Sequence, residues 1–371
     1  MSQTQRLTIQ DAATKGAISI MGIGTARPPL VLTQQEIADF ILNHFTIADR
    51  TKTLYKRVLS HPSIATRHFA LDSLSEVLER DHDRINARYN QWAVRLSTEA
   101  LNNALDKAAV LPDELNFLAV TTCTGYICPG LSSYVVETAH LRKDIHHLDV
   151  VGMGCGAALP ALEQAAMFVS THEGSSAAVV STEISSAALF SNDSPDIVIS
   201  NSLFADGSSA VVIKNRSGKG RPSAPVQPRL ISFASRLYPE WRETLRFRTE
   251  NGYLRNVLAK TVPDQSAKAV RDLVDNILRD AGLKETHISR WIVHSGGDKI
   301  LNAVDKALQL PALALTASRE VLRKCGNLSS ASLFFILEQN IKNQPPKRGE
   351  WGLMVSFGAG FSAYAALVQF E

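Results

Sequence analysis

The chain repeats one order of predicted elements, and this repetition constrains its fold more than any other feature. Helix, strand, helix, strand occurs at residues 85–108, 117–122, 155–169 and 177–181, and again at 266–281, 291–294, from 327, and 353–357. The strands are nearly continuous apolar runs, which is typical of sheets that helices cover on both faces. The order predicts an α/β fold built from two duplicated halves, in which Cys155 and Asn327 begin equivalent helices.

The halves are joined by residues 215–228, which are rich in Gly, Pro, Ser and basic residues and predict a surface connection. At 371 residues the chain is longer than a single core usually grows, so one large unit or two fused units are expected. We place the first unit, with Cys155, at residues 1–228. The second unit, with a histidine and an asparagine described below, is placed at 229–371.

Composition is that of an ordinary globular protein and argues against several kinds of partner. The residues are 45% hydrophobic and 20% charged, and the formal net charge of +3 argues against nucleic acid as the main partner. Four cysteines without metal-finger spacing suit a reducing compartment. No apolar run reaches the roughly 18 residues that span a bilayer, and residues 1–18 show no signal peptide. We therefore expect a cytoplasmic protein with no membrane partner.

Cys155 lies where a short apolar strand, 148–151, meets the start of a predicted helix. The small residues Gly154 and Gly156 leave its thiol uncrowded at this turn. Unpaired N–H groups at a helix N-terminus stabilise a thiolate and lower its pKa, so we expect Cys155 to be a nucleophile. The alternative is a buried cysteine that serves as a small hydrophobic side chain.

His294 and Asn327 occupy comparable places in the second half. His294 ends a predicted strand and precedes two glycines, in the kind of loop that lies at the carboxyl edge of an α/β sheet, where ligands bind. Asn327 stands at a predicted helix start, 33 residues after His294. Taken alone, the histidine is more simply a surface or core residue, and the asparagine a helix N-cap.

Together with their flanking residues, these three positions resemble the thiolase superfamily and, more narrowly, the type III polyketide synthases of the chalcone and stilbene synthase family. Five motifs carry the resemblance in order: Gly-x-Gly-Cys155, Ser202-Leu-Phe-Ala-Asp-Gly207, His294-x-Gly-Gly, Gly326-Asn327-x-Ser-Ser and Ser356-Phe-Gly-Ala-Gly360. The resemblance runs from about residue 18 to the C-terminus. It implies a five-layered αβαβα thiolase fold and a homodimer.

The resemblance also implies a role for each of the three residues. Cys155 attacks a CoA thioester and holds the growing acyl chain. Malonyl-CoA loses carbon dioxide to give an enolate, and the imidazole N–H of His294 and the carboxamide NH2 of Asn327 stabilise that oxyanion. His294 is further expected to stabilise the Cys155 thiolate as an imidazolium. No metal is expected, and no cofactor besides the CoA thioesters.

Further positions of the family shape the cavity. Phe204 matches a phenylalanine that gates the passage between the CoA tunnel and the cavity, with core packing as the alternative. Asn256 stands where a second gate phenylalanine is usual and predicts a more polar gate. The remaining matches are Cys123 (for a common threonine), Glu183 and Ser329, which steer cyclisation; Cys128, at a position that reaches into the partner subunit's cavity; and Ala359, for a usual proline in the cyclisation loop.

Basic residues are expected to hold the CoA phosphates. Arg57 and Lys299 match such positions in the family, with a solvated surface charge as the alternative for each. Leu54 and His61 stand where lysines are usual. Lys56 is therefore a candidate substitute.

Within the family, the amino-acid sequences of segments 149–155, 201–204 and 293–297 most resemble those of bacterial enzymes that make 3,5-dihydroxyphenylacetyl-CoA from malonyl-CoA. This favours malonyl-CoA itself as the starter. An initiating β-ketoacyl-carrier-protein synthase is an alternative that uses the same three residue types for a single condensation. A non-catalytic partner subunit typically loses the nucleophile, and a cysteine hydrolase needs no asparagine at a second helix start.

Overall fold

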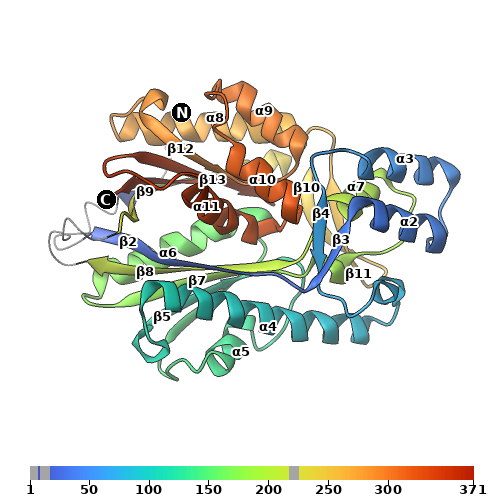
Figure 1. Ribbon diagram of the computed structural model, residues 1–371, viewed down its shortest axis with the longest axis horizontal. Helices are drawn as coiled ribbons and strands as arrows, with labels where there is room; N and C mark the ends of the chain where they lie inside the picture. Colours follow the sequence, from blue (N-terminus) through green and yellow to red (C-terminus); the bar gives the residue numbers. More distant parts are fainter. Residues whose placement is uncertain (1–6, 9–16, 217–224) are drawn as a thin grey trace.

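The computed structural model describes residues 7–8, 17–216 and 225–371 (Figure 1). The predicted connection at 215–228 and the first 18 residues therefore lie partly outside the described residues. Among the described residues, no helix is both long enough and apolar enough to cross a membrane.

Two groups of strands form the two sheet layers, and they repeat one order of strands and directions. The groups join in one continuous ladder where Ser19 pairs with Arg229. The first group runs β6 (His146–Val150), β5 (Phe117–Thr121), β7 (Ser176–Glu183), β8 (Gly207–Arg216) and β2 (Ala17–Ala26). The second runs β12 (Ile288–Val293), β13 (Trp351–Gly358), β14 (Ser362–Phe370) and β9 (Pro228–Leu237), with β1 (Leu7–Thr8) beside β9. In the first group β5 and β7 are parallel, and β8 and β2 follow in antiparallel pairs. In the second group β12 and β13 are parallel, and β14 and β9 follow in antiparallel pairs, so β5-β7-β8-β2 corresponds to β12-β13-β14-β9. The predicted duplication is thus confirmed in the topology.

Helices cover both faces of each sheet and give five layers (Figure 1). The outer layers are α4 (His82–Ala108) with α5 (Leu131–Thr138), and α8 (Val262–Asp280) with α9 (Asp298–Leu308). The middle layer holds α6 (Ala158–Thr171) and α11 (Ser332–Asn343), with α10 (Thr316–Cys325) beside α11. The predicted αβαβα arrangement is confirmed.

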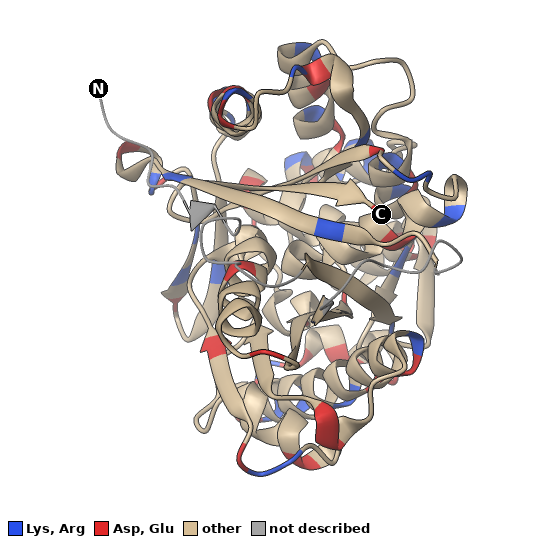
Figure 2. Ribbon diagram, turned by 90° about the vertical axis from the view of Figure 1, so that its left-hand side faces the viewer, with Lys and Arg blue, Asp and Glu red and all other residues tan. Residues whose placement is uncertain are grey.

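The continuous apolar runs of the strands follow from this layering. Every residue of β7 is buried, because the strand has a helix layer on each face. The middle helix α6 buries alanines and leucines, whose small or flexible side chains suit a helix enclosed between two sheets. In Figure 2 the strands are mostly tan, and most charged residues lie on helices and loops.

The helices that carry the two reactive positions begin later than the sequence predicts. Cys155 lies on a short 3₁₀ turn, η3 (Gly154–Gly156), and α6 starts only at Ala158. Asn327 precedes a second 3₁₀ turn, η7 (Ser329–Ala331), which leads into α11. The two turns nevertheless occupy equivalent places in the duplicated halves.

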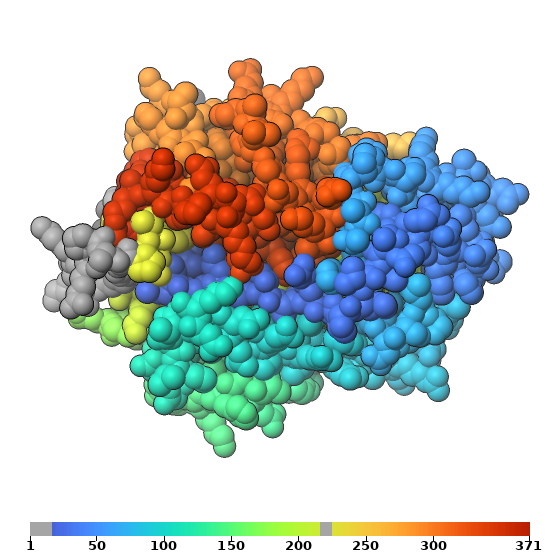
Figure 3. Space-filling view, viewed as in Figure 1, coloured from blue at the N-terminus to red at the C-terminus, as the bar shows by residue number. Residues whose placement is uncertain are grey.

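A smaller group of elements caps one end of the layers, on the right in Figure 1. It comprises β3 (Leu30–Thr33), α2 (Gln34–His44), α3 (Asp49–Leu59), β4 (Thr66–Phe69), α7 (Pro195–Leu203), β10 (Leu245–Glu250) and β11 (Tyr253–Leu258). The 3₁₀ turns elsewhere are Leu74–Leu78, Pro112–Glu114, Ser185–Ala188, Pro239–Trp241 and Glu285–His287. This cap packs against α10: Ala65 N donates to Arg323 O at 2.7 Å. In Figure 3 the blue N-terminal segments meet the orange C-terminal segments there.

Candidate active site

Glycines around Cys155 hold the turn that presents its thiol. Gly154 has a φ of 58°, a conformation that suits glycine, and a Cβ there would lie 3.0 Å from Ala359 N. A Cβ on Gly358 would lie only 2.5 Å from Gly156 N, so the backbone of β13 lies directly against the turn. Cys155 is partly exposed, and its sulfur lies 3.2 Å from Ser329 Oγ.

Asn327 is held through both its backbone and its side chain. Its N–H donates to Leu203 O at 2.9 Å and its carbonyl accepts from Ala205 N at 3.0 Å. Its Oδ1 accepts from Ser329 N at 2.8 Å, and its Nδ2 donates to Gly296 O at 3.2 Å. An amide nitrogen carries two hydrogens, so one N–H of Asn327 is left for a ligand.

His294 is buried at the end of β12. Its backbone N–H donates to Val355 O at 2.9 Å, and its ring packs edge-on against Phe357 with centroids 5.3 Å apart. Nδ1 has no hydrogen-bond partner in the protein. A Cβ placed on Gly296 would lie 3.5 Å from Nε2, so the ring lies against the same glycine that Asn327 binds.

The structure therefore brings the three predicted residues into one connected group. Ser329 contacts both Cys155 and Asn327, and Gly296 lies between Asn327 and His294. Ser329 has a φ of 50°, a strained conformation for a residue with a side chain, which is common where function fixes the backbone.

Burial shifts both reactive groups toward their neutral forms. It raises the pKa of the Cys155 thiol to about 12, with the nearby Glu183 adding to the effect, and it lowers the pKa of His294 to about 3. These shifts run against the expected pair of thiolate and imidazolium, because burial removes the water that stabilises either charge; the pairing stays a prediction. A neutral imidazole can still accept the thiol proton as attack on a thioester begins.

Glu183 is the centre of a buried network beside the nucleophile. Its carboxyl group accepts from Cys123 N at 3.0 Å, from Thr124 Oγ1 at 2.9 Å, from Ser329 Oγ at 3.1 Å and from Ser330 Oγ at 2.5 Å. Burial raises the pKa of Glu183 and also that of Cys123. The three residues matched to cyclisation, Cys123, Glu183 and Ser329, thus form one group that reaches Cys155 through Ser329.

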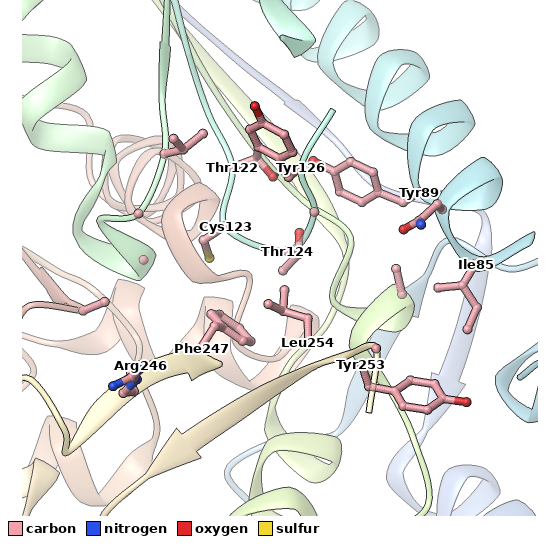
Figure 4. A pocket seen from close by; sticks show the side chains of 18 of the residues that line it. Ile85, Tyr89, Thr122, Cys123, Thr124, Tyr126, Arg246, Phe247, Tyr253 and Leu254 are labelled. Carbon is pink, nitrogen blue, oxygen red and sulfur yellow. Dashed lines mark hydrogen bonds between the residues drawn. The ribbon is translucent and has the colours of Figure 1, made fainter. Parts of the chain in front are cut away.

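A cavity of about 560 Å³ opens beside this network. Gly154 and Cys123 line it on one side, together with Ala359 and Gly360 of the cyclisation loop. In Figure 4, Phe247 and Leu254 lie across from Cys123 and Thr124, and Tyr89 of α4 lines another wall.

The β10–β11 hairpin that supplies part of this wall was missed by the sequence reasoning. Its turn is Asn251-Gly252, with φ values of 52° and 81°. Such an Asn-Gly pair between two short strands is a strong hairpin signal. That signal could have identified Phe247 and Leu254.

The predicted gate residues lie on two elements near the site. Phe204 follows α7, and its backbone is bridged to that of Asn327. Asn256 lies on β11, directly opposite the cavity residue Phe247; it is buried, and its Oδ1 has no partner. Cys128 is exposed in the loop after β5. The gating and cavity roles of these residues stay predictions.

The predicted CoA contacts lie on two helices of the upper part of the molecule. Lys56 and Arg57 are in the last turn of α3, and Lys299 is in the first turn of α9. Lys56, Arg57 and Lys299 are all exposed. At the positions that lack the usual lysines, Leu54 is half-buried and His61 contacts Ser63 Oγ at 2.9 Å. Across the part of the chain that the structure describes, no group of three or more His, Cys, Asp and Glu side chains is arranged to hold a metal ion.

Two family models match the chain. Residues 27–226 match the family described as FAE1/Type III polyketide synthase-like protein, and residues 230–369 match the C-terminal domain of chalcone and stilbene synthases.

Curated relatives match over nearly the whole chain. A 3,5-dihydroxyphenylacetyl-CoA synthase of Streptomyces toyocaensis is 31% identical over 356 residues, covering 94% of this chain and 89% of the relative. A 1,3,6,8-tetrahydroxynaphthalene synthase of Streptomyces peucetius subsp. caesius is 30% identical over 98% of this chain and 95% of the relative. The structure of PKS-I from the brown alga Ectocarpus siliculosus has the same fold, with a TM-score of 0.88 at 21% identity over 96% of this chain and 99% of that structure.

Proposed function

Since this chain belongs to the type III polyketide synthase family, with its chalcone and stilbene synthase C-terminal domain, we propose that it condenses malonyl-CoA repeatedly onto a starter held on Cys155. The observation that carries this proposal is the connected group of Cys155, His294 and Asn327 beside a cavity. One condensation followed by release, as in an initiating carrier-protein synthase, is less well supported, because both family models describe polyketide-type enzymes.

Loading would begin with a proton transfer. As Cys155 Sγ attacks the carbonyl carbon of a CoA thioester, its proton moves to neutral His294, and CoA leaves as a thiolate that takes up a proton. The acyl group is then bound to sulfur.

Extension would use the two neutral donors. When the bond between the malonyl methylene carbon and the carboxylate breaks, carbon dioxide leaves and the electron pair becomes an enolate. The enolate oxygen accepts hydrogen bonds from His294 and from the free N–H of Asn327. The enolate carbon attacks the Cys155 thioester and releases the sulfur, giving a CoA ester two carbons longer, which returns to Cys155 for the next round.

Malonyl-CoA is proposed as the starter, with a product like 3,5-dihydroxyphenylacetyl-CoA. Two relatives bear the names of aromatic polyketide synthases, and Asn256 gives the gate region a buried polar group without a partner. Such a group suits a short, oxygen-rich chain better than a fatty one. No cofactor besides the CoA thioesters is required, and Arg57, Lys299 and Lys56 are proposed to bind the CoA phosphates.

A homodimer is proposed to form along β6, which is the open edge of its sheet. Leu148 on this strand is 37% exposed, Val151 just after it is 51% exposed, and Tyr134 and Met167 on the adjoining α5 and α6 are each 37% exposed. An open strand edge flanked by exposed apolar side chains favours pairing with another chain. A cytoplasmic location is proposed from the four free cysteines.

The test is incubation of the purified protein with malonyl-CoA alone and then with a panel of acyl-CoAs, with products separated by liquid chromatography and their masses read by mass spectrometry. We expect an aromatic polyketide from malonyl-CoA alone. Rapid extension of a long-chain acyl-CoA with no product from malonyl-CoA would contradict the proposed starter. Failure to condense any substrate would contradict the function itself. Light scattering on the same sample tests the dimer.

A further inference from the structure

Arg67 on β4 is a fully buried cation to which the proposed reaction assigns no task. Its guanidinium donates to oxygen atoms of amide and carbonyl groups, and its face lies over the ring of Phe69, 5.0 Å from the centroid. Burial lowers the pKa of Arg67 to about 9, which still leaves it charged at neutral pH. Burying a charge costs free energy unless the group is hydrogen-bonded, so the acceptors that Arg67 binds indicate what the buried charge stabilises.

Two of the three nitrogens of Arg67 donate around the C-terminal end of α7, while Nη2 is buried without a partner. Nη1 donates to Asn201 O at 2.8 Å and to Phe204 O at 2.6 Å, and Nε donates to Gln34 Oε1 at 2.9 Å. Gln34 in turn donates from Nε2 to Ser202 O at 3.0 Å. The last carbonyls of a helix have no partner within it, and a cation favours that end of the helix dipole.

The remaining carbonyl at this end, Leu203 O, accepts from the backbone N–H of Asn327 at 2.9 Å. Arg67, Gln34 and Asn327 thus share one helix end. The stem of Arg67 also lies under the turn before Asn327, since a Cβ on Gly326 would be only 2.9 Å from Arg67 Cγ. Arg67 therefore touches both chain segments that meet at the active site.

We propose that Arg67 is a positioning residue: by holding the end of α7 it fixes the backbones of Phe204 and Asn327, and through them the amide that faces the enolate. This inference rests on the proposed function for its catalytic consequence. A donor to an oxyanion acts only at the correct distance, and misplacement by about 1 Å can cost about 100-fold in rate. Cys155 lies on η3 in the other half and reaches this group only through Ser329.

The test compares two half-reactions in the full-length protein carrying Arg67→Lys. Lysine keeps the positive charge but cannot donate to Gln34, Asn201 and Phe204 at once. We expect the kcat for release of labelled carbon dioxide from malonyl-CoA to fall about 10- to 100-fold, with KM changed less than threefold. The rate at which Cys155 is alkylated by iodoacetamide should stay within about threefold of the parent rate. Gln34→Ala removes only the bond to Ser202 O and the acceptor for Arg67 Nε, so it should lower kcat by a smaller factor.

Arg290→Lys is the matched control. Arg290 is also buried and also donates to carbonyls after a helix, Gln344 O at 2.9 Å and Pro345 O at 3.2 Å beyond α11, but it belongs to the far edge of the second sheet, beside Glu350. If Arg67 matters only for folding, Arg67→Lys and Arg290→Lys should show the same fall in the kcat for carbon dioxide release for a given fall in melting temperature. A selective loss of kcat in Arg67→Lys supports positioning.

A crystal structure of Arg67→Lys separates this inference from the proposed function. Displacement of Asn327 Nδ2 from Gly296 O, or loss of the Leu203–Asn327 bond, is expected whatever the reaction proves to be. An unchanged site in that structure, or decarboxylation within twofold of the parent, would overturn the positioning role. If the parent enzyme itself releases no carbon dioxide, the proposed function fails, and the structural readout alone decides the role of Arg67.

Discussion

Replacing Asn327 by alanine removes two interactions that affect different measurements. The first is the N–H that Nδ2 has left after its bond to Gly296 O. Loss of one such donor to a developing oxyanion costs roughly 3–4 kcal/mol, a factor of about 10²–10³ in rate. The second is the Oδ1 that accepts from Ser329 N. Leaving that buried N–H without a partner costs about 1–3 kcal/mol of folding stability.

The substitution Asn327→Asp distinguishes the two effects. Aspartate keeps an oxygen for Ser329 N but has no NH2, and its charge opposes a nearby enolate. We therefore expect decarboxylation to fall at least as far as in Asn327→Ala, while more of the stability is kept. Loading of Cys155 should survive both changes better than decarboxylation does, because the bond from Ser329 to the sulfur does not involve the Asn327 side chain.

The assay measures labelled carbon dioxide release and acyl-enzyme mass separately for each variant, with Cys155→Ala as the comparison. Cys155→Ala should abolish acyl-enzyme and polyketide yet leave measurable decarboxylation, since the two donors remain. His294→Ala should damage both steps. If Cys155→Ala loses decarboxylation as completely as Asn327→Ala, the division of roles is refuted, and the sulfur must help to position malonyl-CoA.

Three further results are expected. Because burial raises the pKa of Cys155 to about 12, alkylation of the free enzyme by iodoacetamide should rise by about tenfold per pH unit from pH 7 to pH 10; a plateau below pH 8 would show a stabilised thiolate. Arg57→Ala and Lys299→Ala should each raise KM for CoA substrates by an amount worth about 1–2 kcal/mol, and by less at high salt, with kcat little changed; unchanged KM in both would place the phosphates elsewhere. Val151→Glu should weaken the dimer in sedimentation at low protein concentration, whereas an unaltered dimer would exclude the β6 edge as its interface.

The layers of this fold were predictable because strands that helices cover on both faces have nearly continuous apolar sequences. A strand such as β7, buried at every residue, is apolar or small from Ser176 to Ser181, and that pattern separates it from surface segments. The repeated order of such strands and helices then fixes which elements are equivalent. The starts of α6 and α11 were less predictable, because 3₁₀ turns and helix ends share the same residue preferences.

The site was predictable in its residues but not in its electrostatics or its supports. Cys155, His294 and Asn327 carry short motifs that can be read along the chain. The pKa of a thiol, however, depends on how much water its neighbours exclude, and those neighbours come from distant segments such as Ser329 and Glu183. Likewise Arg67 and Gln34 are unremarkable in sequence, and only the fold shows that they share one helix end with Asn327.

The neutrality of the site bears on why His294 and Asn327 suit decarboxylation. A buried cation would bind the malonyl carboxylate strongly in the ground state, and that attraction would have to be given up as carbon dioxide leaves. A neutral imidazole, with its pKa lowered to about 3, and a carboxamide interact most strongly with the enolate oxygen, where negative charge develops only during the reaction. Their stabilisation is therefore greater in the transition state than in bound malonyl-CoA, and only such a difference accelerates the chemical step. Burial raises the pKa of Cys155 and lowers that of His294, so one physical cause shifts both groups toward their neutral forms.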